Sequence, residues 1–169
     1  AFKEQIQFAA RFAHHTFTNL GGIDYGVRWT ELYNLSESPL KGGGEFEHLY
    51  PFRVDLQPDE HPFPVPYVRH ELTMIVEPAI FLRRLTDDFL QNGGKFVIRN
   101  FKSKEEIFAL PEKVFFNCTG LGAARLFDDQ EMSPAKGQLV YMPPDPDVDY
   151  LTIGGGNSNL YMFSRTDTV

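Results

Sequence analysis

The stretch VFFNCTGLGAARLF, residues 114–127, limits the folds open to this chain more than any other segment. A short run of Val and Phe stops at Asn-Cys-Thr, and two glycines then lead into an Ala-rich segment. This pattern is typical of a buried strand that ends in a glycine turn and continues as a helix. In α/β proteins, ligands bind at such turns. The stretch therefore predicts an α/β unit with a ligand-type turn, and we expect Cys118 to be buried at the strand end.

The glycine spacing in this turn differs from that of a phosphate loop. The dinucleotide fingerprint needs Gly at its first, third and sixth positions, and Arg125 stands at the sixth position after Gly120 and Gly122. The runs at 42–44 and 154–156 also fail to match. From the pattern alone, a ligand-binding turn and a plain strand-to-helix turn both remain open.

Periodicity predicts the elements around the turn. Apolar residues at spacings of three to four predict an amphipathic helix over 2–17, and the segments 25–35 and 67–76 have the composition of strands. Pro78 opens a second helix, and Gly93 with Gly94 gives it a left-handed C-cap. Further strands are expected over 95–101, 113–118, 136–142, 150–154 and 160–165.

The order of these elements predicts a mixed fold. Segment 51–66 carries five prolines and is expected to lack regular structure. The strand, helix, strand and glycine turn from 67 onward belong to the α/β class, whereas the last three strands are typical of an antiparallel sheet. We therefore expect a combined α+β and α/β fold with two interleaved domains. Because the chain begins inside a helical pattern and closes at an unpaired strand, we expect it to be a fragment of a longer protein.

Composition and charge exclude several classes of function. A formal net charge of −7 argues against nucleic acid or an anionic membrane as the main partner. No apolar run approaches the ~20 residues of a membrane-spanning helix. Cys118 is the sole cysteine, which excludes an intrachain disulfide and favours the cytoplasm. The adjacent His14 and His15 cannot face one metal ion from a helix, and no metal site is predicted.

Several motifs in order resemble the FAD-dependent D-amino-acid oxidase family. VFFNCTGLGAARL followed by MSPAKGQLVYM is similar to the family's strand ending in Asn-Cys-Thr-Gly and its later Pro-x-Arg-Gly-Gln strand. Upstream, ELTMIVEPAIFLRRLTDDFLQNGGKFVIRNFKS resembles its strand–helix–strand unit. Downstream, NLYMFSR resembles the strand where the substrate pocket begins.

The resemblance implies a split organisation and a set of site residues. Residues 73–131 would form part of a Rossmann-like FAD-binding domain, and 1–72 and 132–169 two parts of a substrate domain with a mixed, largely antiparallel sheet. The family's cofactor contacts map onto Phe101, Cys118, Thr119 and Gly120, and its substrate-facing aromatic onto Tyr161. From the pattern alone, Tyr161 reads as a sheet tyrosine with its hydroxyl in solvent.

The implied activity is oxidation of the C–N bond of an amine or D-amino acid, with hydride transfer to FAD and reoxidation by oxygen. No catalytic side chain is expected within this segment, and the fragment alone is expected to be inactive. The partner would be a small-molecule amine or amino acid, with homo-oligomer formation left open. The compartment would be the cytoplasm, or the peroxisome in a eukaryote.

The chain also departs from the family. Lys136 stands where the family has Arg, and Asn157 where the amino-acid oxidases carry a second pocket tyrosine. The phosphate-binding unit would precede Ala1, and the carboxylate-binding Arg would follow Val169; Arg165 does not take that role. Two alternatives stay open: an oxidase of glycine, sarcosine or another secondary amine, and a non-catalytic binding or assembly domain that keeps the fold.

Overall fold

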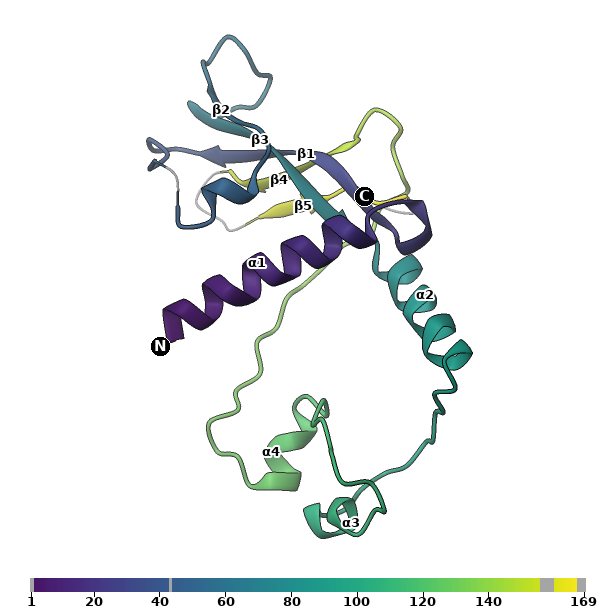
Figure 1. Ribbon diagram of the computed structural model, residues 1–169. Helices are drawn as coiled ribbons and strands as arrows, with labels where there is room; N and C mark the ends of the chain where they lie inside the picture. The colour runs from purple at the N-terminus through teal and green to yellow at the C-terminus, as the bar shows by residue number, and fades with distance from the viewer. Residues whose placement is uncertain (1, 43, 156–159, 167–169) are drawn as a thin grey trace. The chain divides into compact units, whose positions relative to one another are not determined.

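The computed structural model describes residues 2–42, 44–155 and 160–166 (Figure 1). The chain divides into two compact units. Unit 1 combines Ala1–Gly93 with Tyr141–Val169, and unit 2 is Gly94–Val140. Unit 1 is therefore assembled from two separate stretches of sequence. Each unit is described by itself below.

Unit 1 is built on a mixed five-stranded sheet with the strand order β2-β3-β1-β4-β5 (Figure 1). The central strand β1 and its neighbour β3 are ten residues long each and pair antiparallel over their full length. β4 runs parallel to β1, while β2 and β5 pair antiparallel at the two edges. The expected α+β character and the mixed, largely antiparallel sheet are thus confirmed. The strands are β1 (Val27–Ser36), β2 (Arg53–Leu56), β3 (Tyr67–Val76), β4 (Tyr150–Gly154) and β5 (Tyr161–Phe163).

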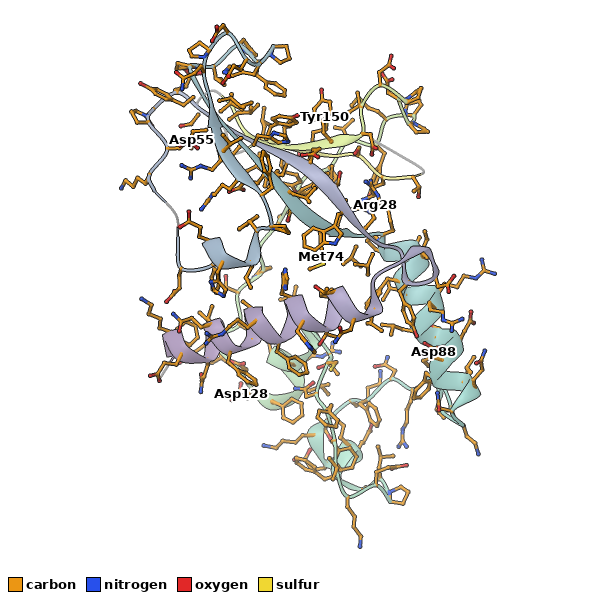
Figure 2. The ribbon with its side chains drawn as sticks, turned by 45° about the horizontal axis from the view of Figure 1, so that its top comes forward. Arg28, Asp55, Met74, Asp88, Asp128 and Tyr150 are labelled. Carbon is orange, nitrogen blue, oxygen red and sulfur yellow. The ribbon has the colours of Figure 1, made fainter. Side chains whose placement is uncertain are left out.

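The first helix, α1 (Phe2–Leu20), confirms the helix predicted over 2–17 and packs against the sheet through its second half. His14 stacks edge-on against Trp29 at 6.0 Å between ring centroids. The Thr18 hydroxyl lies 3.7 Å from the sulfur of Met74, which points from the sheet toward α1 in Figure 2. These contacts place α1 over the end of β1 and β3 that is nearest to α2.

The second helix, α2 (Pro78–Gln91), begins and ends where the sequence predicts. Pro78 occupies its first turn, where the missing N–H costs no hydrogen bond. Gly93 has φ +84°, so the predicted left-handed end is confirmed. The start of α2 is tied to β1, because buried Glu77 accepts a hydrogen bond from Arg28 Nε at 3.2 Å. A short 3-10 helix, η1 (Ile23–Tyr25), precedes β1, and another, η2 (Glu47–Leu49), precedes β2.

Ion pairs connect β2 to β3 on one face of the sheet. Arg69 donates two hydrogen bonds to the Asp55 carboxylate, at 2.5 and 3.0 Å, and a third to the carbonyl of Lys41 at 2.9 Å. Glu71, only 2% exposed, pairs with Arg53 Nε at 2.5 Å. Because β2 has only four residues, these side-chain bonds reinforce a short backbone ladder.

The Asp55–Arg69 pair predicts a pH-dependent stability. Its hydrogen bonds with Arg69 lower the pKa of Asp55 below the usual value. A lowered folded-state pKa gives stability that is present above the unfolded pKa of about 3.9 and is lost as pH falls through the folded value. The Asp55 side chain is 57% exposed, so the contribution is below about 1 kcal/mol.

Urea unfolding between pH 5 and pH 2 of the wild type and of Asp55→Asn measures this contribution. The stability difference between the two proteins should shrink as the pH falls. Gln57→Ala, a nearby uncharged substitution, should leave the wild-type profile unchanged. A difference between wild type and Asp55→Asn that is constant over the whole range would contradict the prediction.

Unit 2 contains two short helices, α3 (Lys104–Phe108) and α4 (Gly122–Phe127). Among its described residues there is no strand, so the strands predicted over 95–101, 113–118 and 136–142 are wrong for this chain. Strands form only when a neighbouring strand completes the backbone ladder, and these segments have none here. Their apolar side chains are exposed accordingly, with Ile98 at 103% and Phe116 at 88%.

The strand β2 lies in a segment for which no regular structure was predicted. Segment 51–66 was expected to be irregular because of its prolines, yet Arg53–Leu56 pairs with β3. Pro51 and Pro58 lie outside these four residues, and β2 is an edge strand. Proline is tolerated beside an edge strand because it removes no ladder hydrogen bond there.

Candidate functional site

The glycine turn in unit 2 has a defined hydrogen-bonded geometry. Asn117 Oδ1 accepts hydrogen bonds from the Thr119 hydroxyl at 2.7 Å and from the Thr119 N–H at 3.3 Å. Gly120 follows with φ +55°, a left-handed conformation that glycine adopts without strain. The carbonyl of Thr119 then accepts from Gly122 N–H at 3.0 Å, where α4 begins. The predicted turn into a helix is therefore present.

The turn also leaves polar groups and space available to a ligand. Among the described residues, no acceptor reaches the backbone N–H groups of Cys118, Gly120 and Leu121. A Cβ atom added at Gly120 would meet nothing within 4 Å. Cys118 is exposed, so the expectation that it is buried is wrong; the strand that would have enclosed it does not form in this chain. Exposed donors beside open space can bond the polar atoms of a flavin cofactor.

The predicted residue Phe101 lies in the segment that leads into α3. Its half-buried ring lies 5.0 Å from the Arg99 guanidinium. Directly after it, the backbone N–H of Lys102 donates to Glu106 at 3.0 Å, which fixes the chain at the start of α3. Cys118, Thr119 and Gly120 are thus together in one turn, while Phe101 belongs to a separate segment of the same unit.

The predicted substrate-facing residue Tyr161 lies in unit 1, on the edge strand β5. The residue is 48% exposed, and its ring lies 5.0 Å from the ring of Phe163. The strand pairing places Tyr161 opposite Ile153 of β4, which is 41% exposed. Side chains of paired residues share a face, so Tyr161 and Ile153 form an open aromatic and aliphatic surface. Asn157, the other predicted departure, lies outside the described residues.

An aromatic cluster centres on Tyr33 of β1. Its ring stacks on His70 at 4.6 Å and meets Tyr150 edge-on at 5.6 Å, and His70 also bonds Glu31. Burial and the Glu31 carboxylate raise the pKa of Tyr33 above its usual value. Since Tyr33 and Asn34 are consecutive strand residues, this cluster occupies the face opposite Asn34. It contains none of the predicted site residues.

A shallow hollow of about 320 Å³ opens beside the start of α2. It contains none of the predicted site residues either. Its Arg84 is paired with Asp88 at 3.3 Å and lies over the Tyr25 ring at 5.3 Å. The charge of Arg84 is therefore compensated within the protein.

Two kinds of feature are absent from the described part of the chain. Within it, no three or more His, Cys, Asp or Glu side chains gather in a way that could hold a metal ion. None of the helices described there has the length and apolar character needed to cross a bilayer.

Two curated proteins are similar to parts of this chain. The D-amino-acid oxidase of Dictyostelium discoideum is 30% identical over 73 residues, which cover 43% of this chain and 21% of that protein. The D-amino acid oxidase of Dugesia ryukyuensis is 25% identical over 130 residues, which cover 73% of this chain and 38% of that protein. Over these stretches the chain is similar to D-amino-acid oxidases. No family model matches it.

The D-amino-acid-oxidase-like relationship agrees with the resemblance seen in the motifs. The matches span about a fifth and about two fifths of the length of these D-amino-acid oxidases. They cover 43% and 73% of this chain and do not test individual site residues. The roles of Phe101, Cys118, Thr119, Gly120 and Tyr161 therefore stay predictions.

Sequence reasoning missed Asn117 as the residue that holds the turn. Its side chain accepts both polar hydrogens of Thr119, so it fixes the residue predicted to contact the cofactor. The signal was available, because Asn and Asp side chains commonly bond the backbone two residues later.

Proposed function

We propose that the full-length protein carrying this chain is a FAD-dependent oxidoreductase that oxidises the C–N bond of an amine or D-amino acid. The observation that carries the proposal is the sequence similarity to two D-amino-acid oxidases, over 73 and 130 residues. The glycine turn supports it, because its exposed N–H donors and open space suit a polar cofactor. The open surface of Tyr161 and Ile153 supports a small organic substrate.

The proposed domain organisation follows the resemblance in the motifs, and its boundaries differ from those of the two compact units. Residues 73–131 would belong to a Rossmann-like FAD-binding domain, and 1–72 and 132–169 to a substrate domain. The discontinuous composition of unit 1 is compatible with interleaved domains. Under this proposal the exposed apolar segments of unit 2, including Val97 and Ile98, become strands when neighbouring strands of a larger sheet are present.

The chain's own residues would bind and orient the cofactor. The N–H groups of Cys118, Gly120 and Leu121 would donate to polar atoms of FAD, and Gly120 would permit close approach of the backbone. The Thr119 hydroxyl oxygen would accept a hydrogen bond from a polar hydrogen of FAD. Asn117 would keep Thr119 in position through its two hydrogen bonds. When bound, FAD would supply the redox chemistry, a two-electron oxidation of the C–N bond with oxygen as the final electron acceptor. Tyr161 would line the substrate side.

The full-length purified protein tests the proposal. We expect flavin absorbance and oxygen consumption with at least one compound from a panel of D-amino acids, glycine, sarcosine and other secondary amines. Turnover restricted to glycine, sarcosine or secondary amines would select that alternative substrate class. A protein that lacks flavin absorbance and binds no added FAD would refute the oxidoreductase and favour a binding or assembly domain.

A matched pair of glycine substitutions tests the role of the turn. Gly120→Ala should weaken FAD binding at least about tenfold, because its methyl group occupies the space that the cofactor needs. Gly93→Ala is the control: Gly93 is also left-handed, at φ +84°, with nothing within 4 Å of its added Cβ. Both variants should lose about 1 kcal/mol of stability from backbone strain.

FAD titration by fluorescence and thermal unfolding of both variants separate strain from cofactor contact. Only Gly120→Ala should change the FAD affinity, while the shifts in unfolding temperature should be similar. Equal FAD affinities for the two variants would remove Gly120 from the cofactor site.

A further inference from the structure

A single cross-strand row joins all five strands of the sheet on the face of Tyr161. Each member pairs directly with the next, and neighbouring side chains share a face at a spacing of about 5 Å. Asn34 of β1 therefore lies roughly 10 Å from Tyr161, with Ile153 of β4 between them. The row consists of Tyr161, Ile153, Asn34, Arg69 and Asp55.

The two ends of this row differ in character. Arg69 is 8% exposed and its guanidinium is occupied by Asp55 and by the Lys41 carbonyl. The other end is open, with Ile153 at 41% and Tyr161 at 48% exposure. A ligand on this face would therefore contact the aliphatic side chain of Ile153 and the ring of Tyr161. Asn34 is the polar side chain nearest to these two residues in the row.

The amide of Asn34 is held in one orientation. Its Nδ2 donates to Glu71 Oε2 at 2.7 Å, and Glu71 is buried and fixed by Arg53. A carboxylate paired with Arg accepts hydrogen bonds, so it requires the NH₂ side of the amide. Because the amide is planar, Oδ1 is directed away from the Glu71 carboxylate. Among the described residues, no donor reaches this oxygen.

We propose that Asn34 is a specificity-determining residue of the substrate site, whose Oδ1 accepts a hydrogen bond from the amino group of a ligand lying over Ile153. Glu71 acts through Asn34 as a positioning residue. The inference rests on the proposed function, since it requires a small amine or amino acid beside Tyr161. An oxygen acceptor favours ligands that carry an N–H group, and it makes no hydrogen bond with an analogue that lacks the amino group.

The test compares two ligands of the full-length flavoprotein, the best amino-acid or amine substrate and the same molecule with hydrogen in place of its amino group. In Asn34→Leu, a nearly isosteric change, kcat/KM for the substrate should fall about 10- to 100-fold. The inhibition constant of the des-amino analogue should stay within about twofold of the wild type, because it makes no bond to Asn34.

A second variant keeps the test decisive if Leu is not tolerated beside Glu71. Asn34→Ala removes the amide without adding bulk and should give the same contrast between the two ligands. Equal losses for both ligands, or no loss for either, would overturn the role of Asn34 while leaving the flavoenzyme intact. A wild-type protein that binds no FAD would overturn the proposed function, and this inference with it.

Discussion

Arg53→Met is expected to destabilise the protein by about 3–5 kcal/mol, because it leaves the Glu71 carboxylate buried without its cation. Glu71 is 2% exposed, and Arg53 Nε lies 2.5 Å from one of its oxygens. The other oxygen accepts from Asn34, a neutral donor that does not compensate the charge. The Arg53 guanidinium also lies 5.5 Å from the Tyr50 ring, so some packing is lost too.

Two comparisons isolate the charge as the cause of this loss. The double variant Arg53→Met with Glu71→Leu removes both ions and should recover most of the stability. Lys3→Met at the Lys3–Glu45 pair, where Lys3 is 78% exposed, should change stability by less than about 0.5 kcal/mol. Chemical denaturation with a constant m-value measures all three variants. A single Arg53→Met variant as stable as the wild type would show that Glu71 does not need its partner.

The helices of unit 1 were predictable because their signals are local. The apolar period defines α1, and Pro78 and Gly93 mark the two ends of α2 within one stretch of sequence. Each of these residues acts on its own backbone or on neighbours three to four positions away. Local sequence therefore contains the information that sets these boundaries.

The strands were predictable only where the chain also contains their partners. β1 and β3 pair with each other over their full length, so composition and structure agree. Segment 95–101 has a similar composition, but no strand pairs with it among the described residues, and its Val97 and Ile98 are 81% and 103% exposed. Exposed apolar runs of this kind indicate a surface that a protein partner or another chain segment covers. A strand forms only beside a hydrogen-bonded neighbour, and the sequence of one segment does not identify that neighbour.

The candidate site also contains some residues that the local sequence identifies and others that it does not. The glycine turn was recognised from consecutive residues, and Gly120 indeed takes a positive φ. Asn34 could not be recognised, because its neighbours Ile153 and Arg69 come from positions far away in the sequence. Only the strand register, once known, brings Asn34 into one row with Tyr161.

Gly154→Ala is expected to separate β4 from β1 and to cost about 3 kcal/mol or more. Gly154 has φ +90°, and an added Cβ would lie 2.2 Å from the Leu35 carbonyl oxygen. A backbone atom cannot move aside as the end of a flexible side chain can, so the parallel pairing must open. Gly154 N–H also donates to the Leu160 carbonyl at 2.8 Å, which ties β4 to the residue before Tyr161.

The same variant should therefore affect the candidate substrate surface before it affects the whole fold. Hydrogen exchange at β5 should accelerate together with exchange at β4, while α1 and the β1–β3 ladder stay protected. Gly42→Ala is the control, since Gly42 lacks a left-handed φ and its added Cβ would meet nothing within 4 Å. Unchanged protection of β5 in Gly154→Ala would mean that Tyr161 is held by contacts other than the β4 pairing. Under this prediction, Gly154 lets β4 lie against Leu35 and thereby holds Tyr161 opposite Ile153.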